Sequence, residues 1–198
     1  MKNMGTEVVA CHVYTKAATG LLCLWLLTCV GCMMVNAGDD ILPSVQAEPT
    51  DASKAIRVTD YTFVCLKKMH PVRGFFVGNL LGKLNDTVAA AMQPEGAPYP
   101  PGSIVQLIPA EVMIKHHKGW SAQTNDWEFF ELAVSANGSK IKVRGTTQVI
   151  NKFGGNCFEC HRQAKPQWDL ICEADHGCEP LPIPDFVIRW TQNSDPRC

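Results

Sequence analysis

The stretch Trp127–Arg144, WEFFELAVSANGSKIKVR, decides the fold of this chain. Its first half is rich in aromatic and branched residues that favour strands, and its second half alternates apolar Ile141 and Val143 with charged residues. Asn137 and Gly138 lie between the two halves, and both tolerate the positive φ angles of a tight hairpin turn. The stretch therefore predicts two antiparallel strands, the second of which has one face in water.

Other strand-like runs lie before this hairpin and predict an antiparallel sheet. Tyr61–Leu66, Gly74–Val77 and Ser103–Ile108 are rich in residues that favour strands. Asp86–Met92 contains three alanines and predicts a short helix. No repeat of about 20–50 residues is visible, and no helix is long enough for a bundle. We therefore expect an α+β fold that is mostly β, with a few short helices.

Composition excludes two broad classes of protein. The chain has 198 residues, of which 46% are hydrophobic and 19% charged, and its 18 Lys and Arg nearly balance its 19 Asp and Glu. Disorder would require low hydrophobicity and a high net charge, and a nucleic-acid-binding protein would carry a basic excess. We therefore expect no nucleic-acid partner. The length suits one domain of about 100–150 residues with an additional segment.

The additional segment lies at the N-terminal end of the sequence. The run AATGLLCLWLLTCVGCMMV is continuously apolar or small and follows two lysines, which is typical of a secretory signal peptide or a retained membrane anchor. A buried helix of the fold is the alternative. We expect the protein to be exported, to a periplasmic or other extracytoplasmic location. The predicted divisions are a signal peptide or anchor at 1–37, a linker at 38–57 and the folded domain at 58–198.

Cysteine content agrees with export. Six cysteines remain after residue 37: Cys65, Cys157, Cys160, Cys172, Cys178 and Cys198. In an exported protein they predict disulfides, covalent cofactor attachment, or both. The four cysteines outside the motif described next allow three disulfide pairings.

Residues Cys157–His161, CFECH, form a C-x-x-C-H pentapeptide, the attachment signature of a c-type haem. On one helical turn, two thiols three residues apart lie on the same side and reach the two haem vinyl groups, while the adjacent histidine faces the iron. The motif therefore predicts one haem c, attached at Cys157 and Cys160 near the C-terminal end of the chain. His161 is the predicted proximal iron ligand.

Three other interpretations of these cysteines stay open at this point. Cys157 and Cys160 could be half of a zinc site that Cys172, His176 or Cys178 completes. They could form a thioredoxin-like redox pair, although no βαβ pattern accompanies them. All six cysteines could instead form disulfides.

Four segments, taken in order, resemble the cytochrome P-460 and cytochrome c′-beta family over about residues 58–185. They are Tyr61–Leu66, Tyr99–Val105, Asn125–Phe130 and Cys157–His161 with Lys165–Leu170 behind it. The resemblance implies an antiparallel sheet with helices, usually in a homodimer, that holds one five-coordinate haem c.

One departure from the family pattern bears on activity. Members that oxidise hydroxylamine carry a haem-linked lysine on the strand after Gly102, where this chain has Leu107, and the next lysine is Lys115. The chain therefore looks more like the c′-beta branch, whose apolar distal pocket binds nitric oxide or a similar ligand. Phe75, Phe76 and Tyr99 could line such a pocket or belong to the core.

Several polar residues are candidates for the surroundings of the haem. Arg73 could hold a haem propionate or lie at the surface. His116 and His117 stand in a charged run that is typical of a solvated face, and Met92 and Met113 are most simply packing residues. We assign no sixth ligand. A change of one residue in register would reverse the faces that Glu111 and Glu128 occupy.

The sequence thus predicts an exported mono-haem cytochrome that binds a small nitrogen-containing ligand such as nitric oxide. One alternative is an oxidoreductase that acts on hydroxylamine or nitric oxide. Another is an electron carrier, which would need Met92, Met113 or His116 as an axial ligand and an electron-transfer protein as its partner. The third is a non-haem domain stabilised by zinc or disulfides.

Overall fold

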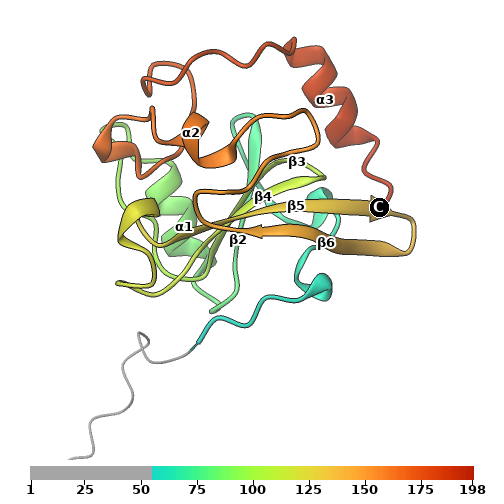
Figure 1. Cartoon of the computed structure of the whole chain (residues 1–198), viewed down its shortest axis with the longest axis horizontal. Helices are drawn as coiled ribbons and strands as arrows, with labels where there is room; N and C mark the ends of the chain where they lie inside the picture. The colour runs from blue at the N-terminus through green and yellow to red at the C-terminus, as the bar shows by residue number, and fades with distance from the viewer. Residues whose placement is uncertain (1–54) are drawn as a thin grey trace, which may run out of the picture. The chain divides into compact units, whose positions relative to one another are not determined.

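An antiparallel sheet of six strands forms the centre of the structure, and its strands lie side by side in chain order (Figure 1). The computed structural model describes residues 55–198. The expected signal peptide or anchor at 1–37, and all but the last three residues of the expected linker, lie outside the described residues. The strands are β1 (His70–Val72), β2 (Phe75–Asn79), β3 (Ser103–Ile108), β4 (Glu111–Lys115), β5 (Trp127–Ser135) and β6 (Gly138–Gly145).

The predicted hairpin is confirmed, with its turn displaced by one residue. Strands β5 and β6 pair antiparallel from Phe129 opposite Gly145 to Ser135 opposite Gly138. Ala136 and Asn137 form the turn, and Gly138 begins β6 with a φ of 110°. Glycine suits this position because it has no Cβ to clash at positive φ.

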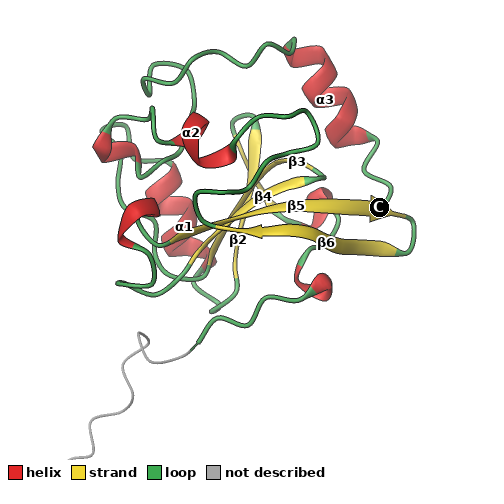
Figure 2. Cartoon of the chain, viewed as in Figure 1, coloured by secondary structure: helices red, strands yellow, loops and turns green. Residues whose placement is uncertain are grey.

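Three short α-helices accompany the sheet (Figure 2): α1 (Leu84–Ala91), α2 (Cys157–His161) and α3 (Asp185–Asn193). Helix α1 overlaps the helix expected at Asp86–Met92, and α2 consists of the C-x-x-C-H motif. Helix α3 was not anticipated from the sequence. A mostly β fold with an antiparallel sheet and a few short helices is thus confirmed. Within residues 55–198, none of the helices has the length and apolarity needed to cross a membrane.

The two faces of the sheet carry separate hydrophobic clusters. One cluster includes Phe75, Val105 and Phe129 from the sheet, and side chains of α1 and α2 pack against it. The other includes Ile114 and Phe130, and the segment before β1 covers it. The first face is therefore the one on which the motif helix lies, and we call it the motif face.

The segment Tyr61–Leu66 does not form the expected strand. Two short 3₁₀ helices occupy this region instead, at Asp60–Thr62 and Leu66–Lys68. The Asp60 side chain accepts a hydrogen bond from the Ile141 amide of β6, at 2.8 Å. Tertiary contacts of this kind override a local preference for strand.

The edge strand β1, His70–Val72, contains a proline at its centre, Pro71. Proline lacks a backbone donor, but an edge strand has one side without a partner strand and so tolerates it. The turn follows immediately, at Arg73, whose φ is 50°.

A disulfide joins the two ends of the folded region. Cys65 is bonded to Cys198, 133 residues further along the chain. Beside this bridge, the buried Asp195 carboxylate accepts a hydrogen bond from the Leu66 amide at 2.9 Å and forms an ion pair with Arg197. The segment after α3 is thus fixed to the segment before β1.

Candidate cofactor-attachment site

Helix α2 consists of the C-x-x-C-H motif, and Asn156 is its N-cap residue. The Asn156 side chain accepts a hydrogen bond from the Glu159 amide at 3.0 Å and donates one to the Thr147 carbonyl at 2.9 Å. The Cys157 amide donates to the Val149 carbonyl at 3.0 Å. Because asparagine is among the best N-cap residues, this sequence starts a helix at the position that the motif requires. The predicted helical turn at Cys157–His161 is confirmed.

The two motif thiols are free, whereas the other four cysteines of residues 55–198 are paired. The bridges are Cys65–Cys198 and Cys172–Cys178, which selects one of the three pairings left open by the sequence. Cys157 and Cys160 carry partly exposed thiols. The interpretation in which all six cysteines form disulfides therefore does not describe this structure.

The surroundings of the thiols disfavour the thiolate form. Burial, and then the nearby carboxylates Glu111 and Glu131, raise the pKa of Cys157 to about 12. Burial and Glu111 also raise the pKa of Cys160. Redox-active and nucleophilic cysteines have the opposite property, a lowered pKa beside positive charge or a helix N-terminus. The environment thus argues against a thioredoxin-like pair.

His161 has one ring nitrogen bonded and the other free to ligate. Its Nδ1–H donates to the Leu170 carbonyl at 2.7 Å, and within residues 55–198 Nε2 makes no hydrogen bond. Burial lowers the pKa of His161 and so favours the neutral imidazole. The ring lies 5.4 Å from the Phe129 ring, between centroids, on the motif face. A neutral imidazole whose Nδ1–H binds a backbone carbonyl is the usual form of a histidine metal ligand.

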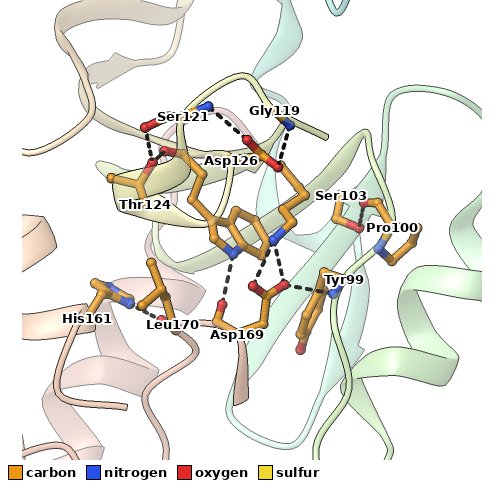
Figure 3. A network of polar contacts seen from close by, with 12 residues as sticks. Tyr99, Pro100, Ser103, Gly119, Ser121, Thr124, Asp126, His161, Asp169 and Leu170 are labelled. Carbon is orange, nitrogen blue, oxygen red and sulfur yellow. Dashed lines mark hydrogen bonds and ion pairs between the residues drawn. The ribbon is translucent and has the colours of Figure 1, made fainter. Parts of the chain in front are cut away.

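A buried ion pair holds the segment that carries the Leu170 carbonyl (Figure 3). Lys115 of β4 donates to both carboxylate oxygens of Asp169, each at 2.7 Å. The Tyr99 amide donates to the same carboxylate at 2.8 Å, and the Trp127 indole donates to the Asp169 backbone carbonyl at 2.8 Å. The expectation of a solvated face around Lys115 and His116 is therefore wrong, since both residues are buried.

Sequence reasoning missed the pair of Lys115 and Asp169. The two residues lie 54 positions apart and belong to no recognisable motif. Only the register of β4 against β5, which places Lys115 opposite Trp127, brings the lysine to this point. No local signal in the sequence could have identified the contact.

Two carboxylates with unpaired oxygens lie on the motif face. Glu111 and Glu131 are directly opposite each other on β4 and β5. One buried oxygen of each finds no hydrogen-bond partner among the described residues. Burial raises the pKa of both, and for Glu111 the charge of Glu131 raises it further. This face is therefore not purely apolar.

Glu128 occupies the opposite face, so the register separates it from Glu111. Its carboxylate is 2.8 Å from the Nε2 of His116 and forms an ion pair with Arg144 at 2.6 Å. His116 is thus engaged away from the motif face. Phe76 also lies on that opposite face, because β2 alternates and Phe75 belongs to the motif-face cluster.

The remaining candidates from the sequence occupy different environments. Met92 is mostly exposed and its sulfur is 3.7 Å from the Arg73 guanidinium. Arg73 itself forms an ion pair with Glu173 and donates to the Ala91 carbonyl. Met113 and Tyr99 are buried in the motif-face cluster, and Leu107 packs against it. Met113 is therefore the one sulfur-bearing candidate for an axial ligand that this cluster contains.

The zinc interpretation lacks its remaining ligands. Cys172 and Cys178 are bonded to each other. The His176 ring stacks on Trp168, and no cluster of candidate metal ligands among the described residues joins it to Cys157 and Cys160. In the part of the chain that the structure describes, the only cluster of three candidate metal ligands is Cys65, Asp195 and Cys198. Its two cysteines form a disulfide, so their sulfurs are not available as thiolate ligands.

Comparisons of the chain with protein-family models, with curated proteins and with solved structures find no match. The function therefore has to be argued from the geometry of α2 and its surroundings.

Proposed function

We propose that residues 58–198 form an exported mono-haem c-type cytochrome domain. In this proposal Cys157 and Cys160 form the two thioether bonds, and His161 is the proximal ligand through Nε2. The observation that carries the proposal is the division of the cysteines. Four of the six pair with each other, and the two left as thiols are those of the C-x-x-C-H helix.

The donor set of α2 fits a c-type haem. Protonated thiols suit this chemistry, because each S–H adds across a vinyl group and no thiolate–metal bond is required. The neutral imidazole, with Nδ1–H on the Leu170 carbonyl, supplies one axial nitrogen. When bound, the haem would supply redox and ligand-binding chemistry at its iron. The residues of this chain would attach it, orient the imidazole and surround it with the motif-face cluster.

We further propose that the iron is five-coordinate and binds a small neutral ligand such as nitric oxide. An electron carrier would need one of three residues as an axial ligand, and two of them are engaged elsewhere: His116 is bound to Glu128, and Met92 is mostly exposed beside Arg73. The third, Met113, is buried in the motif-face cluster. Leu107 stands at the position of the family's cross-linking lysine, and Lys115 is bound to Asp169. These contacts support an open coordination site without a lysine cross-link.

A second function, oxidation of hydroxylamine, is favoured by one specific observation. Removing protons from a bound nitrogen compound requires a base close to it. Glu111 and Glu131 provide two carboxylates with raised pKa on the motif face, and each has an oxygen without a described partner. An electron-transfer protein would then be a required partner.

Location and assembly belong to the same proposal. Two disulfides support an extracytoplasmic site, because thiols stay reduced in most cytosolic proteins. A periplasmic location and a homodimer are what the apolar run and the family resemblance lead us to expect. Analytical ultracentrifugation of the purified protein measures directly whether it is a homodimer.

Intact-protein mass spectrometry tests the haem proposal. The chain is produced in a host with a c-type cytochrome maturation system, beside a Cys157→Ser, Cys160→Ser double variant and a matched Cys172→Ser, Cys178→Ser control. We expect covalent haem in the wild type and the control, and none in the motif variant. Wild-type protein that is folded and carries no haem mass contradicts the proposal.

Spectroscopy and turnover then separate the two functions. A high-spin ferrous spectrum with tight nitric oxide binding and little hydroxylamine oxidation supports the ligand-binding function. Rapid hydroxylamine oxidation with an artificial electron acceptor, lost in Glu111→Gln or Glu131→Gln, supports the enzyme. A low-spin spectrum that becomes high-spin in Met113→Ala would instead indicate an electron carrier.

A further inference from the structure

The buried pair of Lys115 and Asp169 lies one residue away from the only described hydrogen-bond partner of the His161 imidazole. The side chain of Asp169 is fixed by Lys115 and by the Tyr99 amide, and its backbone carbonyl is fixed by Trp127. The next carbonyl along the chain, that of Leu170, accepts the Nδ1–H of His161. A continuous series of contacts therefore runs from the sheet to the ring that presents Nε2 (Figure 3).

The backbone at this point is held in an unfavourable conformation. Asp169 and Leu170 have φ angles of 50° and 65°, and two consecutive non-glycine residues in the left-handed region are uncommon. Such conformations persist only when the surroundings fix them. Four hydrogen bonds to Asp169 do so here, three to its carboxylate and one to its carbonyl. They thereby set the direction of the Leu170 carbonyl.

The ion pair is itself costly to bury. Only 7% of Lys115 and 4% of Asp169 is exposed, and burial lowers the pKa of the lysine and raises that of the aspartate against their mutual attraction. An apolar pair of similar volume often stabilises a fold equally well or better. The pair of Lys115 and Asp169 therefore serves the orientation of the Leu170 carbonyl, and through it that of His161, more clearly than it serves the stability of the fold.

We propose that Lys115 and Asp169 are positioning residues for His161. They fix the Leu170 carbonyl, which binds Nδ1–H, keeps the Nε2 lone pair available and sets the orientation and basicity of the imidazole. This assignment rests on the proposed haem function and adds to it the residues that control the proximal bond. Outer-shell contacts of ligand histidines commonly change metal affinity by about 10–100-fold when they are removed.

The test compares Asp169→Asn and Lys115→Met with Glu128→Gln as a matched control. Glu128 is also a buried carboxylate, held by Arg144 and His116, but it lies on the opposite face of the sheet and does not contact the His161 segment. For each haem-loaded protein we measure the iron–imidazole stretching frequency in the ferrous state, the reduction potential and the free energy of unfolding.

We expect both pair variants to show a lower iron–imidazole frequency, because a freed carbonyl no longer polarises the Nδ1–H bond. Their reduction potential should rise, since a less basic imidazole stabilises ferric iron less. A larger fraction of their haem should lack a protein axial ligand. Glu128→Gln should lose stability while it keeps the wild-type frequency and potential.

The outcomes distinguish this assignment from the haem proposal. A folded wild-type protein without covalent haem overturns both. Haem-loaded Asp169→Asn or Lys115→Met with the wild-type frequency and potential overturns the positioning role alone. If Asp169→Asn does not fold, Lys115→Met decides, because it leaves the Tyr99 and Trp127 contacts to Asp169 in place.

Discussion

Removing the Cys65–Cys198 disulfide should destabilise the fold more than removing Cys172–Cys178, although both bridges are single covalent links. The first closes a loop with a sequence separation of 133 and the second one with a separation of 6. In the chain-entropy treatment, the loops correspond to about 5 and about 2 kcal/mol of unfolding free energy at 25 °C. The expected difference between the two double Cys→Ser variants is therefore about 3 kcal/mol.

Denaturant unfolding, monitored by tryptophan fluorescence, measures this difference. Each pair is replaced by serines together, so that no unpaired cysteine is created, and the midpoint and slope are compared with the wild type. The Cys65 variant should also lose the support that the bridge gives to Asp195 and the Leu66 amide. An equal or larger loss on removing Cys172–Cys178 would refute the reasoning, because the length of the closed loop would then not determine how much each bridge stabilises the fold.

Two further predictions concern the motif face. The folded state raises the pKa of Glu131, so its contribution to stability is present below the unfolded pKa of about 4.3 and is lost as the pH rises through the folded value. Glu131→Gln should therefore stabilise the protein at pH 7 and have little effect near pH 4. Chemical denaturation at both pH values measures this, and a larger effect at pH 4 than at pH 7 would contradict it. Asn156→Ala removes the N-cap of α2 and should cost about 1 kcal/mol and lower the haem yield, whereas Asn156→Asp keeps the capping acceptor and should recover most of both. Equal losses in the two Asn156 variants would show that the bond of Asn156 to the Thr147 carbonyl, and not the cap, determines the effect.

Local patterns were sufficient for most of the sheet. The β5–β6 hairpin, β2 and β3 follow from runs of branched and aromatic residues with turn residues between them. The segment before β1 was predicted wrongly, because Asp60 bonds to a strand amide 81 residues away. A contact at that separation leaves no trace in a short window of sequence.

In the candidate site, too, the motif residues could be predicted from local sequence, whereas their surroundings depend on long-range contacts. The C-x-x-C-H spacing identified Cys157, Cys160 and His161 because all three lie on one helical turn. The residues that set their environment come from β4, β5 and the segment after α2, which the register of the sheet brings together. Glu131 was overlooked and Glu128 considered in its place, since strand residues only three apart occupy opposite faces.

Cys198 follows the motif cysteines in the chain, and its bridge to Cys65 imposes an order on how the disulfides form. Consecutive strands pair with each other, so the hairpins can form progressively as the chain emerges. Before Cys198 is available, the thiols of Cys157 and Cys160 are already present, and either of them could form a disulfide with Cys65. Rapid covalent use of the two motif thiols would remove the competitors before the last bridge closes. If the proposed haem attachment occurs, it would protect the fidelity of disulfide formation, and a chain produced without haem should accumulate isomers in which Cys65 is paired with a motif cysteine.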